Sequence, residues 1–208
     1  MYVPIEQFAI PSDISIFGSH FGQHTYYASF AGLAKKYQPQ DILEIGVRFG
    51  YSGIAMCLGA LAGGRSVESL EYHGIDACYF SHPDDPSWLS NDVAREHFQR
   101  MVPGLYLELH RYDTRRGLPE EVNLRLATYD LINVDGDHSF EGCYRDLGNI
   151  WPLATPGALV VVDDVGMEDV RRAISLFSGE RLAAGELAGF QWYQNERGWA
   201  ILQKVADQ

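Results

Sequence analysis

The stretch DILEIGVRFGYSG, residues 41–53, decides how this chain folds. An apolar run over 41–46 predicts a short buried strand, and the residues that follow predict a helix over 52–62. Glycines between the two permit positive φ angles and close approach of the backbone, and a helix N-terminus offers unpaired N–H groups. The stretch therefore predicts a ligand-binding turn, although a purely structural turn also explains the glycines.

Glu44 narrows the kind of ligand that such a turn could bind. It lies in the buried strand two residues before Gly46, where a carboxylate is costly unless it is paired or faces a ligand. Its charge would repel a pyrophosphate and would suit a cationic cofactor. The glycine spacing also departs from the GxGxxG pattern of dinucleotide-binding turns.

Strands and helices alternate outward from this turn, which predicts an α/β fold with a mostly parallel seven-stranded sheet and helices on both faces. The last two strands are joined through a short connection with glycine, which predicts an antiparallel hairpin. We expect a single domain, with a helical or lid segment over 1–38 and the main domain over 39–208. The expected strands are 41–46, 69–77, 106–112, 129–134, 158–163, 190–195 and 199–204, and the expected helices are 25–37, 52–62, 88–101, 140–150 and 168–177.

Composition limits the partners and the location of the protein. The 208 residues carry a net charge of −12 and no basic stripe, which argues against a nucleic-acid partner. We expect a small-molecule partner, no membrane partner and a cytoplasmic location, because the sequence shows neither a signal peptide nor ~20 consecutive apolar residues. The three cysteines lack metal-binding spacing and are expected to fill the core. A homo-oligomer is possible.

Acidic residues also follow other expected strands, where they could contribute to the same ligand site. Asp76 follows the second expected strand, where an acid can bind ribose hydroxyls, and Glu71 is the fallback. A loop aspartate is the plain alternative for Asp76. Asp113 follows the third strand and could lie near an adenine, but capping of a helix explains it equally well.

Four more acids follow the fourth and fifth expected strands. Asp135 and Asp137 follow one, and Asp163 and Asp164 follow the other. Because neighbouring parallel strands lie ~5 Å apart, we expect these carboxylates to converge. Like charges held together favour a compensating cation, and an oxygen-only set suits Mg²⁺, with Ca²⁺ or Mn²⁺ as alternatives. Helix capping and a polar loop are the alternatives without metal.

Two of these motifs resemble a known family. LEIGVRFGYSG resembles the first motif of class I S-adenosylmethionine-dependent methyltransferases, and DGDHSFEG (135–142), followed by Gly157 and the Asp163–Asp164 pair, resembles a methyltransferase family that includes metal-dependent O-methyltransferases acting on sugar hydroxyls of natural products. The resemblance implies a Rossmann-like fold, S-adenosylmethionine as cofactor and methyl transfer to a hydroxyl oxygen. The cofactor-binding residues that it implies are Glu44, Gly46, Gly50, Ser52, Asp76, Asp113 and Asp135.

The resemblance also implies chemical roles. Asp135, Asp163 and Asp164 would be the metal ligands, and Asp137 or His138 the general base. His138 could equally hydrogen-bond a backbone carbonyl and hold its loop.

Other functions stay open at this point. They are a nicotinamide dehydrogenase, a non-catalytic binding protein on a methyltransferase fold, and a metal-dependent hydroxylase or hydrolase that uses the same acids. Aromatic and histidine residues over 14–30 could form a lid, and core packing or a dimer contact explains them equally well.

Overall fold

A seven-stranded sheet forms the centre of the computed structural model, which describes residues 24–78, 90–193 and 198–206. The strand order is β3-β2-β1-β4-β5-β7-β6, and β7 runs antiparallel to both of its neighbours. The predicted mostly parallel sheet with a terminal antiparallel hairpin is therefore confirmed. The strands are β1 (Asp41–Ile45), β2 (Glu71–Asp76), β3 (Tyr106–Arg111), β4 (Tyr129–Val134), β5 (Ala154–Val162), β6 (Leu187–Tyr193) and β7 (Trp199–Lys204).

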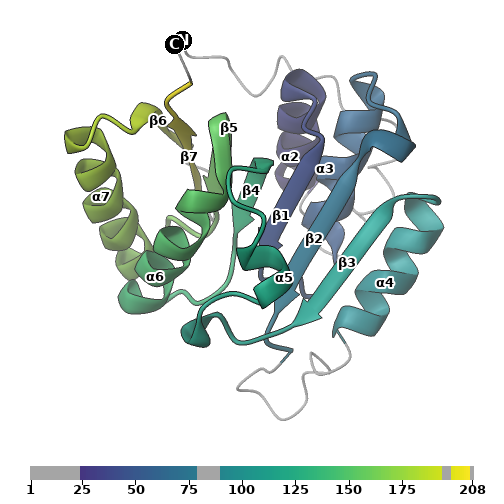
Figure 1. Ribbon diagram of the computed structural model, residues 1–208, viewed down its shortest axis with the longest axis horizontal. Helices are drawn as coiled ribbons and strands as arrows, with labels where there is room; N and C mark the ends of the chain where they lie inside the picture. The colour runs from purple at the N-terminus through teal and green to yellow at the C-terminus, as the bar shows by residue number, and fades with distance from the viewer. Residues whose placement is uncertain (1–23, 79–89, 194–197, 207–208) are drawn as a thin grey trace.

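Helices cover both faces of the sheet, as Figure 1 shows. One layer consists of α2, α3 and α4, and the other of the short α5 with α6 and α7. The helices are α2 (His24–Tyr37), α3 (Tyr51–Ala62), α4 (Ser90–Met101), α5 (Glu120–Asn123), α6 (Phe140–Ile150) and α7 (Glu168–Ala183), with 3-10 turns η3 (Val67–Ser69), η5 (Thr114–Arg116) and η6 (Trp151–Leu153).

Strict alternation along the strands separates two cores. On β1, Ile42 packs against the α2–α3–α4 layer and Leu43 against the α5–α6–α7 layer. On β4, Leu131 and Ile132 divide in the same way. Because both faces are buried, these strands read as continuous apolar runs, and the few polar residues within them stand out.

Helix α2 is part of the packed core. Ala31 and Ala34 are fully buried, and a Cβ on Gly59 of α3 would lie 2.2 Å from the carbonyl oxygen of Ala31. The two helices therefore approach to backbone contact. The lid proposed for 14–30 rests on residues that lie mostly outside the described part of the chain, and within it Phe30 is a core residue.

Among the strands, β5 begins furthest from its predicted start, and helix α7 runs six residues past its predicted end at 177. Strand β5 begins at Ala154 rather than at 158, although it contains Pro156 and Gly157. An irregularity in the β4–β5 register accommodates the extra residues. Pairing with β4 overrides the turn signal of the Thr155-Pro156-Gly157 sequence, as tertiary context commonly does.

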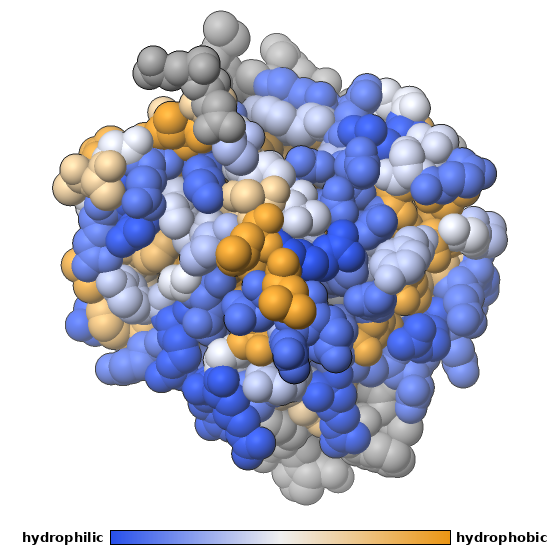
Figure 2. Space-filling model, viewed as in Figure 1, coloured by the Kyte–Doolittle hydropathy of each residue, from blue (hydrophilic) through white to orange (hydrophobic). Residues whose placement is uncertain are grey.

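The surface fits the acidic composition. Figure 2 shows a largely hydrophilic face, with an apolar group over the middle of the view around α5. Leu124 and Leu126, directly after α5, are exposed. No helix of the described residues is long and apolar enough to span a membrane.

Candidate functional site

The carboxyl ends of the four central strands form one continuous edge. The backbone N–H of Gly46 donates to Ile75 O at 2.8 Å, and that of Asp135 donates to Ile45 O at 2.8 Å. These bonds tie the loop after β1 to β2, and the loop after β4 to β1. Ligands of open parallel sheets bind at this edge, so it is the place to look for the predicted site.

Three of the five non-glycine residues that have positive φ angles in the described part of the chain lie at this edge. Arg48, Cys78 and Asp164 follow β1, β2 and β5, and all three have positive φ angles near 50°. Residues other than glycine rarely adopt this conformation, and it persists where the surrounding structure fixes it. The loops at this edge are therefore held in specific shapes.

Gly46 and Gly50 are required by the shape of the turn. Gly46 has a φ of +87°, and a Cβ there would lie 1.8 Å from the carbonyl oxygen of Asp135. Gly50 has a φ of +81°, and its Cβ would lie 2.8 Å from the ring of Phe98. The first glycine thus brings the turn against the loop after β4, and the second seats α3 against α4.

Glu44 lies beneath the turn in a closed network of hydrogen bonds. The Ser52 hydroxyl donates to its Oε1 at 2.5 Å, and Asn133 Nδ2 donates to the same oxygen at 2.7 Å. The Tyr72 hydroxyl donates to Oε2. These donors come from α3, β4 and β2, so a single carboxylate joins three elements.

This enclosure restricts access to Glu44, and the cofactor contacts expected of Glu44 and Ser52 stay predictions. The side chain has no exposed surface, and burial raises its pKa from 4.5 to about 7 despite the three donors. Because the side chain has no exposed surface, a direct contact with a cofactor would require the surrounding residues to move. The structure thus places Glu44, and Ser52 with it, where they support the turn from below.

Asp76 is the acid that the structure brings to the turn. Its two carboxylate oxygens accept hydrogen bonds from the backbone N–H groups of Arg48 and Cys78, each at 2.6 Å. Its side chain remains partly exposed at the carboxyl end of β2. The fallback Glu71 is wrong for this site, because it begins β2 at the opposite edge and pairs with Arg125 at 2.6 Å.

Asp113 has the role of a cap. Its Oδ1 accepts from the backbone N–H of Arg115 at 3.0 Å, and its Oδ2 pairs with the Arg115 guanidinium at 2.8 Å. It therefore begins the η5 turn, which is the capping alternative. Its place near an adenine stays a prediction.

Asp135, His138 and Asp164 meet at the ends of β4 and β5. His138 Nε2 lies 3.1 Å from Asp135 Oδ1 and 3.5 Å from Asp164 Oδ2, and one ligand atom from each residue lies within 4.8 Å of the others. The hydrogen bond to Asp135 is the main cause that raises the pKa of His138, and the charges of nearby aspartates add to it. All three side chains are partly exposed, so a ligand can reach them.

The other two acids of the predicted cluster lie differently. Asp163 is buried and is not one of the three grouped residues, whereas His138 is. The metal-binding role that the resemblance implies for Asp163 stays a prediction. Asp137 is exposed, and its Oδ1 accepts from the backbone N–H of Ser139 at 3.0 Å. Ser139 in turn caps α6 by accepting from Gly142 N at 3.1 Å.

Two buried polar residues were missed from the sequence. Asn133 binds Glu44, and its signal was a polar side chain inside the apolar run of β4. Asp146 lies in α6 under the loop after β4, where a Cβ on Gly136 would approach its Oδ2 to 2.8 Å. Burial raises the pKa of Asp146 to about 6. The residues that Asn133 and Asp146 contact are not adjacent to them in sequence, so no short motif indicates these contacts.

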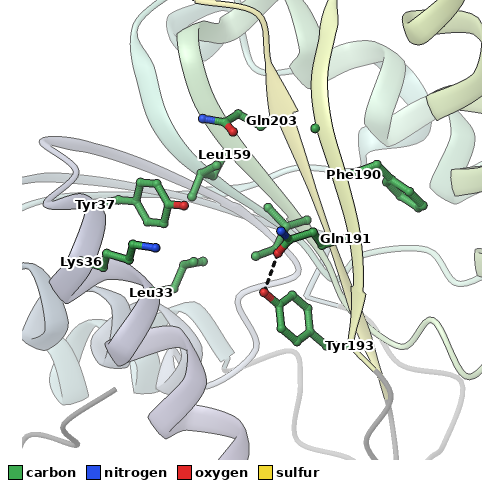
Figure 3. A pocket seen from close by; sticks show the side chains of 10 residues that line it. Leu33, Lys36, Tyr37, Leu159, Phe190, Gln191, Tyr193 and Gln203 are labelled. Carbon is green, nitrogen blue, oxygen red and sulfur yellow. Dashed lines mark hydrogen bonds between the residues drawn. The ribbon is translucent and has the colours of Figure 1, made fainter. Parts of the chain in front are cut away.

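A pocket of the described residues lies elsewhere, between α2 and the β6–β7 hairpin (Figure 3). Figure 3 shows Lys36 and Tyr37 on one wall and the Tyr193–Gln191 hydrogen bond, 2.7 Å long, on the other. None of the predicted site residues lines it. We therefore assign the candidate site to the carboxyl edge and not to this pocket.

The chain resembles known methyltransferases in sequence and in fold. A sequence profile described as a methyltransferase domain matches residues 43–165, which contain the turn and both acidic motifs. A search of curated protein sequences finds no match.

Solved structures share the fold over most of the chain. They include an O-methyltransferase from Bacillus cereus in complex with S-adenosylhomocysteine, with 17% identity, a TM-score of 0.66 and coverage of 97% of this chain and 100% of the other. A second is the O-methyltransferase TomG from Streptomyces achromogenes, involved in tomaymycin synthesis and bound to S-adenosylmethionine, with 16% identity, a TM-score of 0.64 and coverage of 96% and 92%. A third is an S-adenosylhomocysteine-bound methyltransferase from Podospora anserina, with 17% identity, a TM-score of 0.63 and coverage of 94% and 88%. At these identities the likeness shows the fold.

Proposed function

The chain belongs to the methyltransferase-domain family and has the class I fold, and from this premise we propose that it transfers the methyl group of S-adenosylmethionine to a hydroxyl oxygen of a small molecule. A sugar or another natural product is the acceptor class that we propose, with assistance from a divalent cation. The observation that carries the proposal is the meeting of Asp135, His138 and Asp164 beside the glycine turn.

The turn would bind the cofactor. Gly46 and Gly50 keep the backbone bare of side chains where α3 begins, and the partly exposed carboxylate of Asp76 lies beside them. The cofactor supplies an electrophilic methyl group. Glu44, locked by its three donors, fixes the strand and helix on either side of the turn and so preserves its shape.

The open cluster would prepare the acceptor. Two carboxylates and an imidazole within 4.8 Å of one another fit a divalent cation, and the imidazole makes Mn²⁺ as suitable as Mg²⁺. Such a cation lowers the pKa of a hydroxyl and orients it. With His138 engaged as a ligand, Asp137 on the same exposed loop would accept the proton; without a cation, His138 would accept it, with Asp135 stabilising the imidazolium.

Two measurements test the proposal in sequence. Calorimetric titration of the purified chain with S-adenosylhomocysteine should show one binding event, and no binding would refute cofactor-dependent methyl transfer. Release of S-adenosylhomocysteine in the presence of a panel of sugars and other hydroxyl compounds then tests the acceptor class. If only amines or thiols are methylated, the hydroxyl assignment is wrong.

Chelation tests whether turnover requires a divalent cation. Excess EDTA should abolish turnover, and Mg²⁺ or Mn²⁺ should restore it. Asp164→Asn should raise the cation concentration needed, whereas the matched control Asp169→Asn, on the exposed start of α7, should not. Full turnover in EDTA would remove the cation from the mechanism; His138→Gln should then lower the turnover rate by roughly 10²–10⁴-fold with little change in cofactor affinity.

A further inference from the structure

A second group of potential ligands lies on the outer strands of the sheet, away from the candidate active site. His73 on β2 is the register partner of Glu108 on the edge strand β3, and His110 lies two residues further along the same face of β3. His73 Nδ1 is 3.2 Å from Glu108 Oε2, and His110 Nε2 is 3.6 Å from the same oxygen. One atom from each residue lies within 4.8 Å of the others.

The imidazole of His73 has carboxylates on both sides. It has no exposed surface, and neither of its ring nitrogens makes a hydrogen bond among the described residues. Glu71 Oε2 lies 3.6 Å from Nε2, while Glu108 Oε2 faces Nδ1. A neutral imidazole has a single N–H, so one nitrogen must turn its lone pair toward a carboxylate. A cation between Nδ1 and Glu108 would remove this conflict.

Neighbouring residues orient Glu108 and Glu71 and balance the charge around His73, as a metal site requires. The Tyr106 hydroxyl donates to Glu108 Oε1 at 2.5 Å, which leaves Oε2 for the two histidines. Arg125 binds Glu71 at 2.6 Å and also pairs with Asp41 at 3.0 Å, so its own charge is matched by two carboxylates. Histidine ligands of metals commonly donate their second N–H to a carboxylate, as Nε2 could to Glu71.

We propose that His73, Glu108 and His110 bind a divalent transition-metal ion, and that Zn²⁺ is the ion that this set fits best. Two imidazoles and one carboxylate are a common zinc ligand set, with a fourth position left for solvent. Ligand atoms of a tetrahedral zinc ion lie roughly 3.3–3.6 Å apart, given bond lengths of about 2.0–2.2 Å. The two contacts to Glu108 Oε2, at 3.2 and 3.6 Å, are close to this spacing.

Position on the sheet defines what the ion would do. The side chains of Glu108 and His110, on the edge strand β3, are 36% and 19% exposed. Solvent can therefore reach the fourth position. The ion would join the edge strand β3 to β2, which stabilises a strand that only one neighbour holds by hydrogen bonds.

Calorimetry with Zn²⁺ on the full, metal-stripped chain tests this site. The titration is run on Asp164→Asn protein, because Asp135, His138 and Asp164 could bind zinc as well. One equivalent should still bind and should raise the melting temperature. Adding His110→Ala should weaken zinc binding by at least 100-fold. Tyr106→Phe removes only the hydrogen bond to Glu108 and keeps all three ligands, and Tyr106 is half-exposed, so this variant should weaken zinc binding roughly 10-fold.

A matched control and a spectroscopic signature complete the test. Glu108→Gln should abolish binding, while Glu121→Gln on the exposed surface of α5 should leave it unchanged. Co²⁺ in place of Zn²⁺ should give the visible absorption of a tetrahedral site, lost in Glu108→Gln. Absence of zinc binding in Asp164→Asn protein, or equal affinity in Tyr106→Phe and its parent, would overturn the proposal; the latter holds even if His110→Ala does not fold.

Discussion

Two groups of side chains lie at the same edge of the sheet, and the fold treats their acids in opposite ways. The Glu44 carboxylate has no exposed surface and receives hydrogen bonds from three neutral side chains. The side chains of Asp135 and Asp164 are 23% and 17% exposed and share His138 between them. We call the first the closed group and the second the open group.

The difference shows that an acid at a strand end need not be a ligand. In the closed group both carboxylate oxygens of Glu44 accept from protein donors, so its contribution is to hold β1, β2, β4 and α3 in register. In the open group three ionisable side chains face one another with access to solvent, which leaves capacity for a proton or a cation. At this edge of the sheet, the closed group thus maintains the fold, and the open group is available for chemistry.

The largest expected effect on stability comes from Gly46, where the turn after β1 contacts the loop after β4. Gly46→Ala would drive a methyl group into the carbonyl of Asp135, and we expect it to cost more than about 4 kcal/mol in free energy of unfolding, or to prevent folding. Gly185→Ala is the matched control, because Gly185 also has a positive φ but has nothing within 4 Å of a Cβ. Its cost should be about 1–2 kcal/mol, measured by urea denaturation. Equal costs would show that the close approach is unimportant.

The second effect is a pH dependence that belongs to the closed group. Because the folded state raises the pKa of Glu44 from 4.5 to about 7, the folded protein retains this proton where the unfolded chain has lost it. Stability should therefore fall as the pH rises from about 4.5 to about 7, by roughly 3 kcal/mol, and stay constant above that range.

Glu44→Gln isolates this contribution. In Glu44→Gln the fall in the free energy of unfolding, measured in urea, should be smaller by this amount, and what remains should come from Asp146, whose pKa burial raises to about 6. The exposed variant Glu121→Gln should follow the wild-type curve. Parallel curves for all three proteins would contradict the burial of an ionisable Glu44.

The smallest effect on stability is expected in the open group. Asp135→Asn removes the hydrogen-bonded carboxylate that chiefly raises the pKa of His138, so the His138 pKa should fall. The change in free energy of unfolding should be below about 1 kcal/mol, because the pair is partly exposed. An NMR titration of the metal-stripped protein measures this pKa, with Asp169→Asn as the control. An unchanged His138 pKa would mean that the two side chains do not interact in solution.

Local sequence patterns predicted most of the fold. The limits expected for β4 (129–134) and α6 (140–150) agree with the structure residue for residue, because a continuous apolar run and a capped amphipathic stretch are short-range signals. The start of β5 was missed, since pairing across the sheet and not local propensity decides it. Methyltransferase membership also followed from local motifs.

The candidate site was predictable only as a set of positions. Spacing placed Asp76, Asp135 and Asp164 at the correct edge, because the carboxyl ends of parallel strands must meet there. It could not distinguish Asp163 from Asp164, which are adjacent in sequence but differ in burial. The metal, the base and the acceptor stay predictions.

The turn over 41–53 shows most clearly which features are local and which depend on the tertiary structure. The sequence by itself determined that a strand, a glycine turn and a helix follow one another, since φ freedom and apolar periodicity are properties of neighbouring residues. Only the tertiary structure decided that Glu44 is enclosed by Tyr72 and Asn133, which lie 28 and 89 residues away. A buried carboxylate takes whichever donors the packed strands bring to it, and their identity depends on strand order and register.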